Sequence, residues 1–482
     1  MNGGMAGSGA AGCVLCIHGH FYQPPRMDPF TGRIPDEPEA APYANWNERI
    51  TAECYTPNAE AGHFGHISFN LGGTLAAWLD REAHATYARI VADARAYYAA
   101  HGVSNGLVQP VHHTILPLAR RRDKICQVRW GIASFRHRFG HDTRGLWLPE
   151  MAVDLDTLQI LVQEGIRFTI LSPEQVQGDL SAGAGPYRVR LPNGGGEIAV
   201  FVRDRDLSNN LAFNMPDSAY VDEWLRDWLG RRCTGGRLVL IATDGETFGH
   251  HRRQGVAVLG RILAAAAGGS TSQPPEYRPA VPYLLTTLGQ YLDQHPPQTE
   301  VEVIENTAWS CAHRLDRWAV GCPCTPGDSR WKGGLRRALD NLACDLDAVY
   351  VNETRALGLD PWRLRDDAIA IVLGQVDGMA YLSGNGVGHL TQEQARRLLL
   401  LLEAQLYRQR MYASCAFFFE DLERLEPRYA IGNAVRAIAL TRYATGDDLC
   451  HGFRRDLRVP VSGRSGRNAA EIFDTILARA EI

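Results

Sequence analysis

Short apolar runs alternate with longer amphipathic stretches through the first 300 residues of the chain. Apolar runs that end in polar or turn-forming residues predict strands at 13–21, 106–113, 145–150, 167–173, 196–204, 237–246 and 283–292. The segment 154–165 predicts a helix with an Asp cap and a Gly stop. This alternation of strand and helix signals predicts an α/β fold built on a parallel barrel or sheet.

The pattern changes near residue 300. Segments 392–410 and 430–444 have the spacing of long amphipathic helices, and few strand signals accompany them. We therefore predict a barrel domain over residues 1–300 and a mainly helical domain over residues 301–482. Two loops stand out, a Pro-rich segment at 23–46 and a Gly-rich, hairpin-like turn at 193–197.

Composition limits the classes of function. At 482 residues the chain is expected to form two or three structural units, and its net charge of -4 predicts neither a nucleic-acid nor a membrane partner. The 11 cysteines are scattered, and Cys13, Cys16 and Cys233 adjoin apolar runs, where buried free thiols are common. A reducing compartment fits this usage best.

No targeting segment is recognisable. Residues 1–12 lack both the basic and the apolar parts of a secretory signal, and stretches such as 259–269 are too short to span a bilayer. The sequence therefore predicts a cytoplasmic protein.

Polar side chains gather where the predicted strands end. In a parallel barrel the carboxyl ends of all strands open onto one face, where catalytic groups collect. A single carboxylate there is often only the cap of the next helix, but several polar groups together indicate a site. These groups are His18, His20, His112, His113, Glu150, Arg203, Asp204, Asp244, Glu246, His250 and His251.

Two carboxylates on separate strand ends suit a reaction in which one attacks and the other transfers a proton, as in retaining glycoside hydrolysis. Glu150 and Asp244 are the candidates. Trp147 would add an aromatic surface on which a sugar ring stacks. This mechanism needs neither a metal nor a cofactor.

At these residues the chain resembles glycoside hydrolase family 57. The motifs are "HGHFYQPP", "WLPE", "DGETFGH" and "HHTILPLARRRDK". The segments 306–318 and 412–422 resemble the amylase- and mannosidase-like subgroup, whose catalytic barrel precedes a domain of unassigned function. The resemblance implies a (β/α)7 barrel with a helical C-terminal region, acting on α-linked glucans with retention. It implies that Glu150 is the nucleophile and Asp244 the acid/base.

The same resemblance suggests which residues contact the substrate. His18 and His20, two apart at a strand end, are favoured as site residues over core histidines, and Glu246 would share a face with Asp244. The helical domain is expected to pack on the barrel mouth. The further substrate-binding candidates are His113, Trp147, His250, Trp309, His313 and Trp318. The chain departs from the subgroup at "LGGTL", at Phe417 and at Glu420, which puts its sugar-binding pattern in question.

Other functions remain open. A 4-α-glucanotransferase or branching enzyme would use the same two carboxylates and pass the glycosyl group to a sugar instead of water. His18, His20, Asp244 and His250 could ligate a divalent metal, as in metal-dependent mannosidases and deacetylases. A non-catalytic glucan binder is a third possibility. Linkage, chain-length preference and oligomeric state are undetermined.

A zinc site is an alternative for one cysteine cluster. Cys311, Cys322 and Cys324 could bind zinc together with His313. Their spacing matches no regular pair of Cys-x-x-Cys motifs, so buried thiols are favoured and no metal is predicted.

Overall fold

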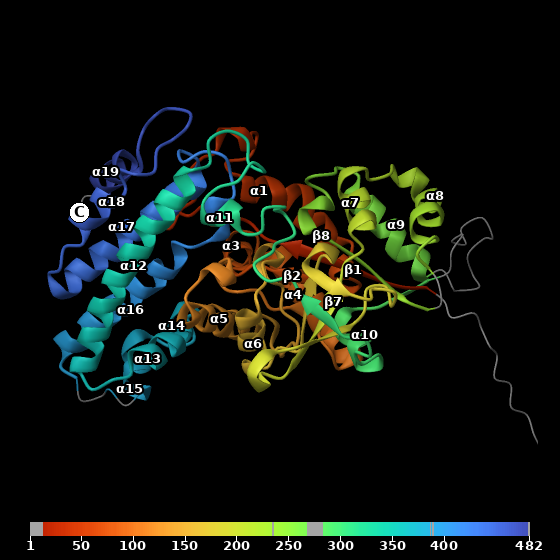
Figure 1. Ribbon diagram of the computed structural model, residues 1–482, viewed down its shortest axis with the longest axis horizontal. Coiled ribbons are helices and arrows are strands. Elements are labelled where there is room, and N and C mark those ends of the chain that lie inside the picture. The colour runs from red at the N-terminus through yellow and green to blue at the C-terminus, as the bar shows by residue number, and fades with distance from the viewer. Residues whose placement is uncertain (1–12, 234–235, 268–282, 386, 388–389, 481–482) are drawn as a thin grey trace, which may run out of the picture. The chain divides into compact units, whose positions relative to one another are not determined.

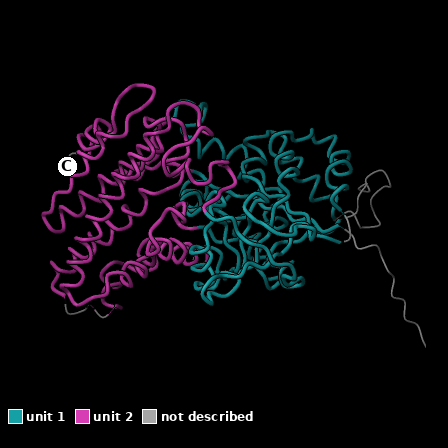
Figure 2. The backbone as a smooth tube through the Cα atoms, viewed as in Figure 1, with its two compact units in different colours: residues 1–23, 37–109, 138–305 teal, residues 24–36, 110–137, 306–482 magenta. Residues whose placement is uncertain are grey.

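The computed structural model describes residues 13–233, 236–267, 283–385, 387 and 390–480. The amino-terminal segment 1–12, in which no signal peptide was recognised, lies outside these residues. The chain divides into two compact units (Figure 2). Unit 1 comprises residues 1–23, 37–109 and 138–305, and unit 2 comprises residues 24–36, 110–137 and 306–482.

Unit 1 contains the strands of the described residues (Figure 1), of which the parallel ones form a ring. The strands are β1 (Cys13–Phe21), β2 (Ser68–Leu71), β3 (Gly106–Leu107), β4 (Phe168–Leu171), β5 (Val176–Gly178), β6 (Tyr187–Arg190), β7 (Glu197–Val202), β8 (Leu238–Asp244), β9 (Tyr283–Leu285) and β10 (Val301–Val303). β1 pairs in parallel with β2, β8 and β9, and β2 pairs with β3. The long apolar runs of β1 and β8 suit strands that are buried on both faces.

Single bridges complete the ring. Val108 pairs with Leu146 and Gly145 with Phe168, so the irregular segment 145–147 lies between β3 and β4. β4 then pairs in parallel with β7. The amide of Asp204, just after β7, donates to the carbonyl oxygen of Leu240 in β8. The ring therefore closes as a barrel of parallel segments, as the sequence predicted.

The helices of unit 1 follow these strands along the chain. They are α1 (Trp46–Ile50), α2 (Thr56–Glu60), α3 (Gly73–Glu82), α4 (His84–His101), α6 (Leu155–Gln163), α7 (Arg205–Phe213), α8 (Val221–Trp224), α9 (Gly255–Ala267) and α10 (Leu288–Gln294). The predicted cap of α6 is present, since the Asp154 carboxylate accepts the Thr157 amide at 2.8 Å. The Gly-rich turn at 193–197 does connect an antiparallel hairpin, β6 to β7.

The prediction about two cysteines of unit 1 needs correction. Cys13 and Cys233 are not free thiols but form a disulfide, so the argument for a reducing compartment loses part of its basis. The physical reason is the parallel pairing of β1 with β8, which brings the start of β1 and the turn before β8 to a Cα separation of 4.7 Å. β2 was also not predicted, because its four residues are too short to show a period.

Unit 2 is mainly helical, as predicted. Its helices are α5 (Arg121–Phe139, whose last residues belong to unit 1), α11 (Asp316–Ala319), α12 (Trp331–Ala356), α13 (Pro361–Asp367), α14 (Ile369–Val372), α15 (Gly378–Gly384), α16 (Gln392–Arg410), α17 (Leu425–Thr445), α18 (Cys450–Asp456) and α19 (Ala469–Arg479). The long helices α12, α16 and α17 lie side by side (Figure 1). α16 begins and ends where its sequence pattern predicts, behind a capping box at Thr391.

A buried ion network ties α5 to the other helices of unit 2. The Asp123 carboxylate accepts from Arg365 at 3.0 Å and from Arg408 at 2.7 Å, and both arginine side chains are fully buried. Arg408 also contacts Asp347 at 2.7 Å. This network explains why residues 110–137, which the sequence analysis assigned to the barrel domain, fall within unit 2.

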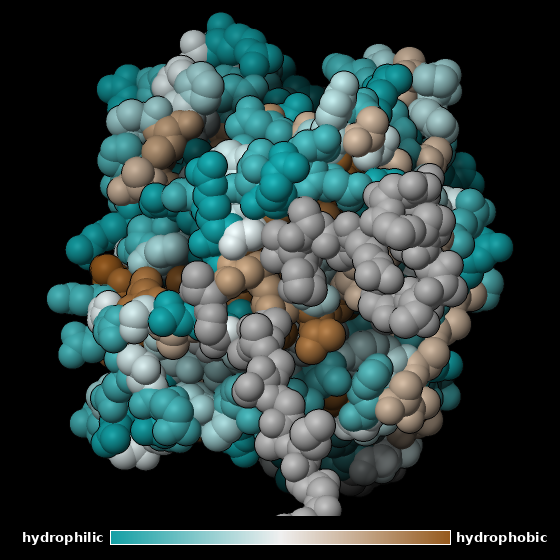
Figure 3. All heavy atoms as spheres, turned by 90° about the vertical axis from the view of Figure 1, so that its right-hand side faces the viewer, coloured by the Kyte–Doolittle hydropathy of each residue, from teal (hydrophilic) through white to brown (hydrophobic). Residues whose placement is uncertain are grey.

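Hydrophilic side chains predominate on the face drawn in Figure 3, and hydrophobic side chains appear there in small groups. Within the described part of the chain, no helix combines the length and the apolar character needed to cross a membrane. The apolar residues of unit 1 lie instead in its strands and the inner faces of its helices.

Replacing Asp123 with Ala should destabilise unit 2 strongly, because two buried guanidinium groups would lose their carboxylate partner. Breaking a buried pair from one side costs about 3–5 kcal/mol. We expect this loss in the free energy of unfolding from urea titration. The exposed Asp345 of α12 provides the control, and Asp345→Ala should change stability by less than about 0.5 kcal/mol. Equal stability of the two variants would contradict the importance of the network.

Candidate active site

The register of β1, β2 and β8 places polar residues opposite one another on adjacent strands. In β1, His18 lies opposite Ser68 of β2 and Ala242 of β8, and His20 lies opposite Asn70 and Asp244. Alternate residues of a strand point to the same side, so His18 and His20 share a face. The carboxyl ends of β1, β2 and β8 thus bring His20, Asn70 and Asp244 together, as the sequence predicted for two of them.

Both histidines are held by β2. The Nε2 atom of His18 lies 3.1 Å from the Asn70 side-chain oxygen, and its Nδ1 atom lies 3.1 Å from the Ser68 hydroxyl. The Asn70 amide nitrogen lies 2.9 Å from His20 Nδ1 and donates to the Gln109 side-chain oxygen at 2.5 Å. Asn70 therefore fixes the positions of both rings.

Trp147 packs against the two histidines. Its ring stacks on His18 at a centroid distance of 4.9 Å and on His20 at 4.8 Å. The Trp147 side chain has no exposed surface, so the predicted platform for a sugar ring is not present. The two imidazole rings occupy the surface that was assigned to substrate, and Trp147 supports them instead.

Burial keeps both imidazoles neutral. It lowers the pKa of His18 and of His20 to about 3. Neither ring carries a charge near neutral pH, so both act as hydrogen-bonding groups of fixed orientation.

Glu150 follows the irregular segment 145–147 in a tight turn, Pro149–Met151. Its backbone has a φ of 58°, in the left-handed region that non-glycine residues rarely adopt. Such conformations concentrate at functional sites, where the surrounding structure maintains them. The side chain is only half-buried, so it is within reach of solvent or a ligand.

Asp244 ends β8 and is half-buried. Burial raises its pKa to about 7, and the nearby charge of Glu150 adds to this effect. Arg203 opposes it, since a cation favours the ionised carboxylate. Glu150 and Asp244 are thus close enough to interact, and Asp244 retains a proton in part of its population near neutral pH.

Glu246 lies in the turn after β8 and is buried. Its Oε1 atom accepts the Tyr55 hydroxyl at 2.6 Å and the Tyr22 amide at 3.1 Å. Burial, together with Asp244, raises the pKa of Glu246 to about 8. Because Oε1 is occupied by donors, the proton would reside on Oε2. Glu246 is therefore mostly neutral at pH 7 and adds little negative charge beside Asp244.

Gly245 allows this turn to form. A Cβ atom at this position would lie 2.3 Å from the ring of Phe21, which is completely buried at the end of β1. Only glycine permits the approach without moving the ring or the strand. The glycine of "DGE" therefore sets the distance between the carboxylate-bearing turn and β1.

Arg203 lies just after β7, where the sequence placed a polar strand end. Its Nε atom donates to the Ser172 hydroxyl at 3.1 Å, and its Nη1 atom donates to the Ala242 carbonyl at 3.3 Å. These contacts hold a buried cation near Asp244. Arg203 is a positioning residue that the sequence analysis noted without assigning a role.

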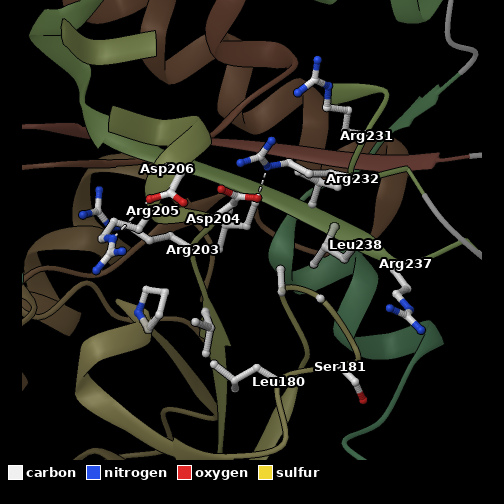
Figure 4. Close-up of a pocket in the computed structure, with 16 residues that line it drawn as sticks. Leu180, Ser181, Arg203, Asp204, Arg205, Asp206, Arg231, Arg232, Arg237 and Leu238 are labelled. Atoms are coloured by element: carbon white, nitrogen blue, oxygen red, sulfur yellow. Dashed lines mark hydrogen bonds and ion pairs between the residues drawn. The ribbon is translucent and has the colours of Figure 1, made fainter. Parts of the chain in front are cut away.

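Arg203 also lines a cavity of about 460 Å³ (Figure 4). Figure 4 shows the Arg232 side chain reaching toward Asp204, with which it forms an ion pair. Of the described residues that line this cavity, none is Glu150, Asp244 or Glu246. The cavity is therefore distinct from the group of carboxylates.

His250 contacts an acidic and an aromatic side chain of unit 1, and its part in substrate binding stays a prediction. Its Nδ1 atom lies 2.6 Å from a carboxylate oxygen of Glu53, and its ring contacts Trp46 at a centroid distance of 5.7 Å. Across the described residues, potential metal ligands gather in threes or more only at Cys311, His313, Cys322 and Cys324. His18, His20, Asp244 and His250 do not form such a group.

The remaining candidates belong to unit 2. His113 is buried, with Nδ1 2.6 Å from the Ser414 hydroxyl. Trp318 is fully buried near Phe418, Trp309 is half-buried, and His313 is exposed with Nδ1 3.2 Å from Cys324 Sγ. Their part in substrate binding stays a prediction.

Sequence reasoning missed Asn70 and Tyr55. The polar Asn70 within the apolar "ISFNL" run was the available signal, because a buried polar residue in a strand needs partners. Tyr55 lies in a short π-helical segment, Thr51–Tyr55, that has no recognisable sequence pattern.

The comparisons with known proteins show the family of the chain. Residues 59–297 match the profile of glycosyl hydrolase family 57, and residues 328–482 match a domain of unknown function, DUF3536. The chain belongs to glycosyl hydrolase family 57. A search of curated proteins gives no significant match to this family 57 sequence.

Solved structures share the fold of this family 57 glycoside hydrolase at low sequence identity. An exo-type maltose-forming amylase from Pyrococcus sp. ST04 is 14% identical with a TM-score of 0.70, over 97% of this chain and 92% of the amylase. A branching enzyme from Thermococcus kodakaraensis is 14% identical with a TM-score of 0.56, over 97% and 94%. An α-amylase from Thermotoga maritima is 12% identical with a TM-score of 0.57, over 95% and 98%.

Replacing Arg203 with Met should raise the pKa of Asp244 further, because the opposing cation is lost. In this family 57 enzyme we expect Asp244 to set the basic limb of the pH profile of kcat/KM. The basic limb of the pH profile should shift to higher pH by about one unit. Arg203→Lys, which keeps the charge, is the matched control and should move it less. An unchanged limb in Arg203→Met would show that Asp244 does not set it.

Proposed function

We propose that this glycoside hydrolase acts on α-glucans or α-gluco-oligosaccharides with retention of anomeric configuration. The proposal is supported by the two carboxyl groups Glu150 and Asp244, which are near enough for Glu150 to raise the pKa of Asp244. A retaining enzyme needs one carboxylate to attack and one acid to donate a proton. We expect their carboxyl groups to lie about 5–5.5 Å apart in the substrate complex.

In the first step the Glu150 carboxylate attacks the anomeric carbon, and Asp244 protonates the leaving glycosidic oxygen. Esterification of Glu150 removes the charge that helps to raise the pKa of Asp244. That pKa then falls, so Asp244 becomes the stronger acid and is mostly ionised. It can accept a proton from the incoming hydroxyl in the second step, which releases the sugar.

Neutral groups around the pair are suited to bind sugar hydroxyls. His18 and His20 are uncharged and held by Asn70, and Glu246 is mostly protonated at neutral pH. Such groups both donate and accept hydrogen bonds without adding negative charge. We propose His20, which retains slight exposure, and Glu246 as hydroxyl-binding residues.

The α-glucan class is supported by the named activities of the similar structures, which include amylases and a branching enzyme. Hydrolysis and transfer share both carboxylates and differ only in whether water or a sugar hydroxyl resolves the intermediate. Product profiles from maltooligosaccharides, glycogen and pullulan distinguish them: shorter products alone indicate hydrolysis, and longer or branched products indicate transfer.

We also propose that the segment 306–318 contributes to substrate binding. It carries Trp309, His313 and Trp318, and of the two tryptophans only Trp309 keeps an exposed surface. Trp309 is accordingly the one suited to stack on a sugar ring.

The roles of the two carboxyl groups are tested by substrates with different leaving groups. Asp244→Asn should lower kcat on maltooligosaccharides by about 10²–10⁴-fold, because their leaving oxygen needs a proton. Activated aryl α-glucosides leave without protonation, so the loss on them should be below about tenfold for the first step. Glu150→Gln should abolish activity on both. Glu223→Gln, on the exposed face of α8, is the control.

The stereochemistry gives an independent readout. NMR of the first product should show the α-anomer, and peptide mass mapping after rapid quenching should locate the glycosyl ester on Glu150. Equal losses of Asp244→Asn on both substrate types, or a β-anomeric product, would overturn the assigned roles.

Trp309→Ala should raise KM for maltooligosaccharides by about 2- to 13-fold with little change in kcat, since an aromatic contact contributes about 0.5–1.5 kcal/mol. Tyr443→Ala is the control, because Tyr443 is an exposed aromatic residue of α17 in the same unit. An unchanged KM would exclude the proposed contact.

A further inference from the structure

Four potential metal ligands meet in a short segment of unit 2. They are Cys311, His313, Cys322 and Cys324, and their ligating atoms all lie within 4.8 Å of one another. The Cys311 and Cys322 sulfurs are 3.6 Å apart, and His313 Nδ1 is 3.2 Å from the Cys324 sulfur. The sequence analysis favoured separate buried thiols here, but the structure brings them together with a histidine.

These separations fit a tetrahedral zinc ion. With Zn–S bonds of about 2.3 Å and Zn–N bonds of about 2.0–2.1 Å, two sulfurs of a tetrahedron lie about 3.8 Å apart, and a sulfur and a nitrogen about 3.6 Å. These two distances are a few tenths of an ångström shorter than the tetrahedral values, and the other ligand atoms lie within 4.8 Å of one another.

The backbone of the segment turns around the cluster. Ala308 and Cys311 form an antiparallel bridge, and the short helix α11 then returns the chain to Gly321 beside Cys322. A Cβ atom on Gly321 would lie 2.3 Å from the Ser329 carbonyl oxygen, and φ there is 96°. Glycine is thus required where the chain turns into the second pair of ligands.

Backbone amides also point at the sulfurs. The amides of His313 and Arg317 hydrogen-bond to the Cys311 sulfur, and the amide of Ala312 hydrogen-bonds to the Cys324 sulfur. Such contacts orient metal-binding thiolates and offset part of their charge.

A buried cation balances the charge of the cluster. Lys332 is completely buried, and its ammonium donates to two neutral oxygens, the Thr325 hydroxyl and the Phe418 carbonyl, each at 3.3 Å. It interacts electrostatically with Cys311 and Cys322. Three thiolates and a neutral imidazole around Zn²⁺ carry a net charge of -1, which a single lysine neutralises. A buried ammonium is costly unless such a partner is present.

We propose that Cys311, His313, Cys322 and Cys324 bind one structural Zn²⁺ ion. All four tetrahedral positions are filled by protein ligands, so no position is open for water or substrate. The ion cross-links residues 311–324, a segment whose only helix is α11. Its function is to hold this segment in shape, and it takes no part in bond cleavage.

The site consists of Cys-x-His and Cys-x-Cys separated by eight intervening residues, and this spacing explains why pattern analysis did not detect it. Familiar structural zinc sites are recognised by paired Cys-x₂₋₄-Cys motifs. Here each pair has only one intervening residue, and the histidine replaces a cysteine in the first pair.

Full-length protein produced in zinc-supplemented medium and dialysed against metal-free buffer is the material for the test. Elemental analysis should give about one Zn²⁺ per chain. After replacement by Co²⁺, the absorption spectrum should show the intense visible d–d bands of a tetrahedral thiolate site and the near-ultraviolet thiolate charge-transfer bands. X-ray absorption at the zinc edge should give three sulfur ligands near 2.3 Å and one nitrogen ligand near 2.0–2.1 Å.

The double variant Cys322→Ser/Cys324→Ser should retain less than about one tenth of the zinc. The control is Cys344→Ser, which removes an exposed cysteine of α12 outside the cluster and should bind as much zinc as the parent chain. Because a variant could fail to fold, the Co²⁺ spectrum of the parent chain is decisive. Less than about 0.1 Zn²⁺ per chain with no thiolate-to-cobalt bands, or a Cys311–Cys322 disulfide found by mass mapping, would overturn the proposal.

Discussion

The parallel register of β1 with β2 and β8 is the constraint on which the candidate site depends. A shift of one residue between β1 and β8 would move His20 away from Asp244, and a shift against β2 would separate both histidines from Asn70. Because the barrel closes through the hydrogen bond of Asp204 to Leu240, the positions of Arg203 and of the turn at Glu150 are fixed by the same ring. One set of backbone hydrogen bonds therefore determines which charges meet.

Burial then gives carboxyl groups of the same chemical type different pKa values. Glu246 is enclosed by Tyr55 and the Tyr22 amide and stays mostly neutral at pH 7, whereas Asp244 titrates close to neutrality. The histidines of β1 are neutral because they are buried. A substrate in this site would meet few fixed charges apart from Glu150 and Arg203. This environment favours a division of roles in which Glu150 is the ionised nucleophile and Asp244 the protonated donor. Neighbouring carboxyl groups that are all ionised would repel one another.

The long elements and the two catalytic candidates could be predicted from the sequence. β1, β7, β8, α6 and α16 have clear periods or caps, and a carboxylate at a strand end is visible without a structure. Asn70 could not be assigned, because its strand has four residues and its partners are 50 and 52 positions away. Trp147 was misread as exposed, because its sequence context does not reveal that two histidines cover its ring.

Unit 2 shows how polar interactions select one arrangement where apolar packing alone would allow several. Helices such as α16 can slide or rotate against one another at little cost in buried apolar area, but the Asp123 carboxylate satisfies Arg365 and Arg408 in only one arrangement. The segment 311–324 contains only one short helix. Four ligand side chains around one metal ion would specify its path, because the free energy of metal binding is gained only in the arrangement that brings the ligands together.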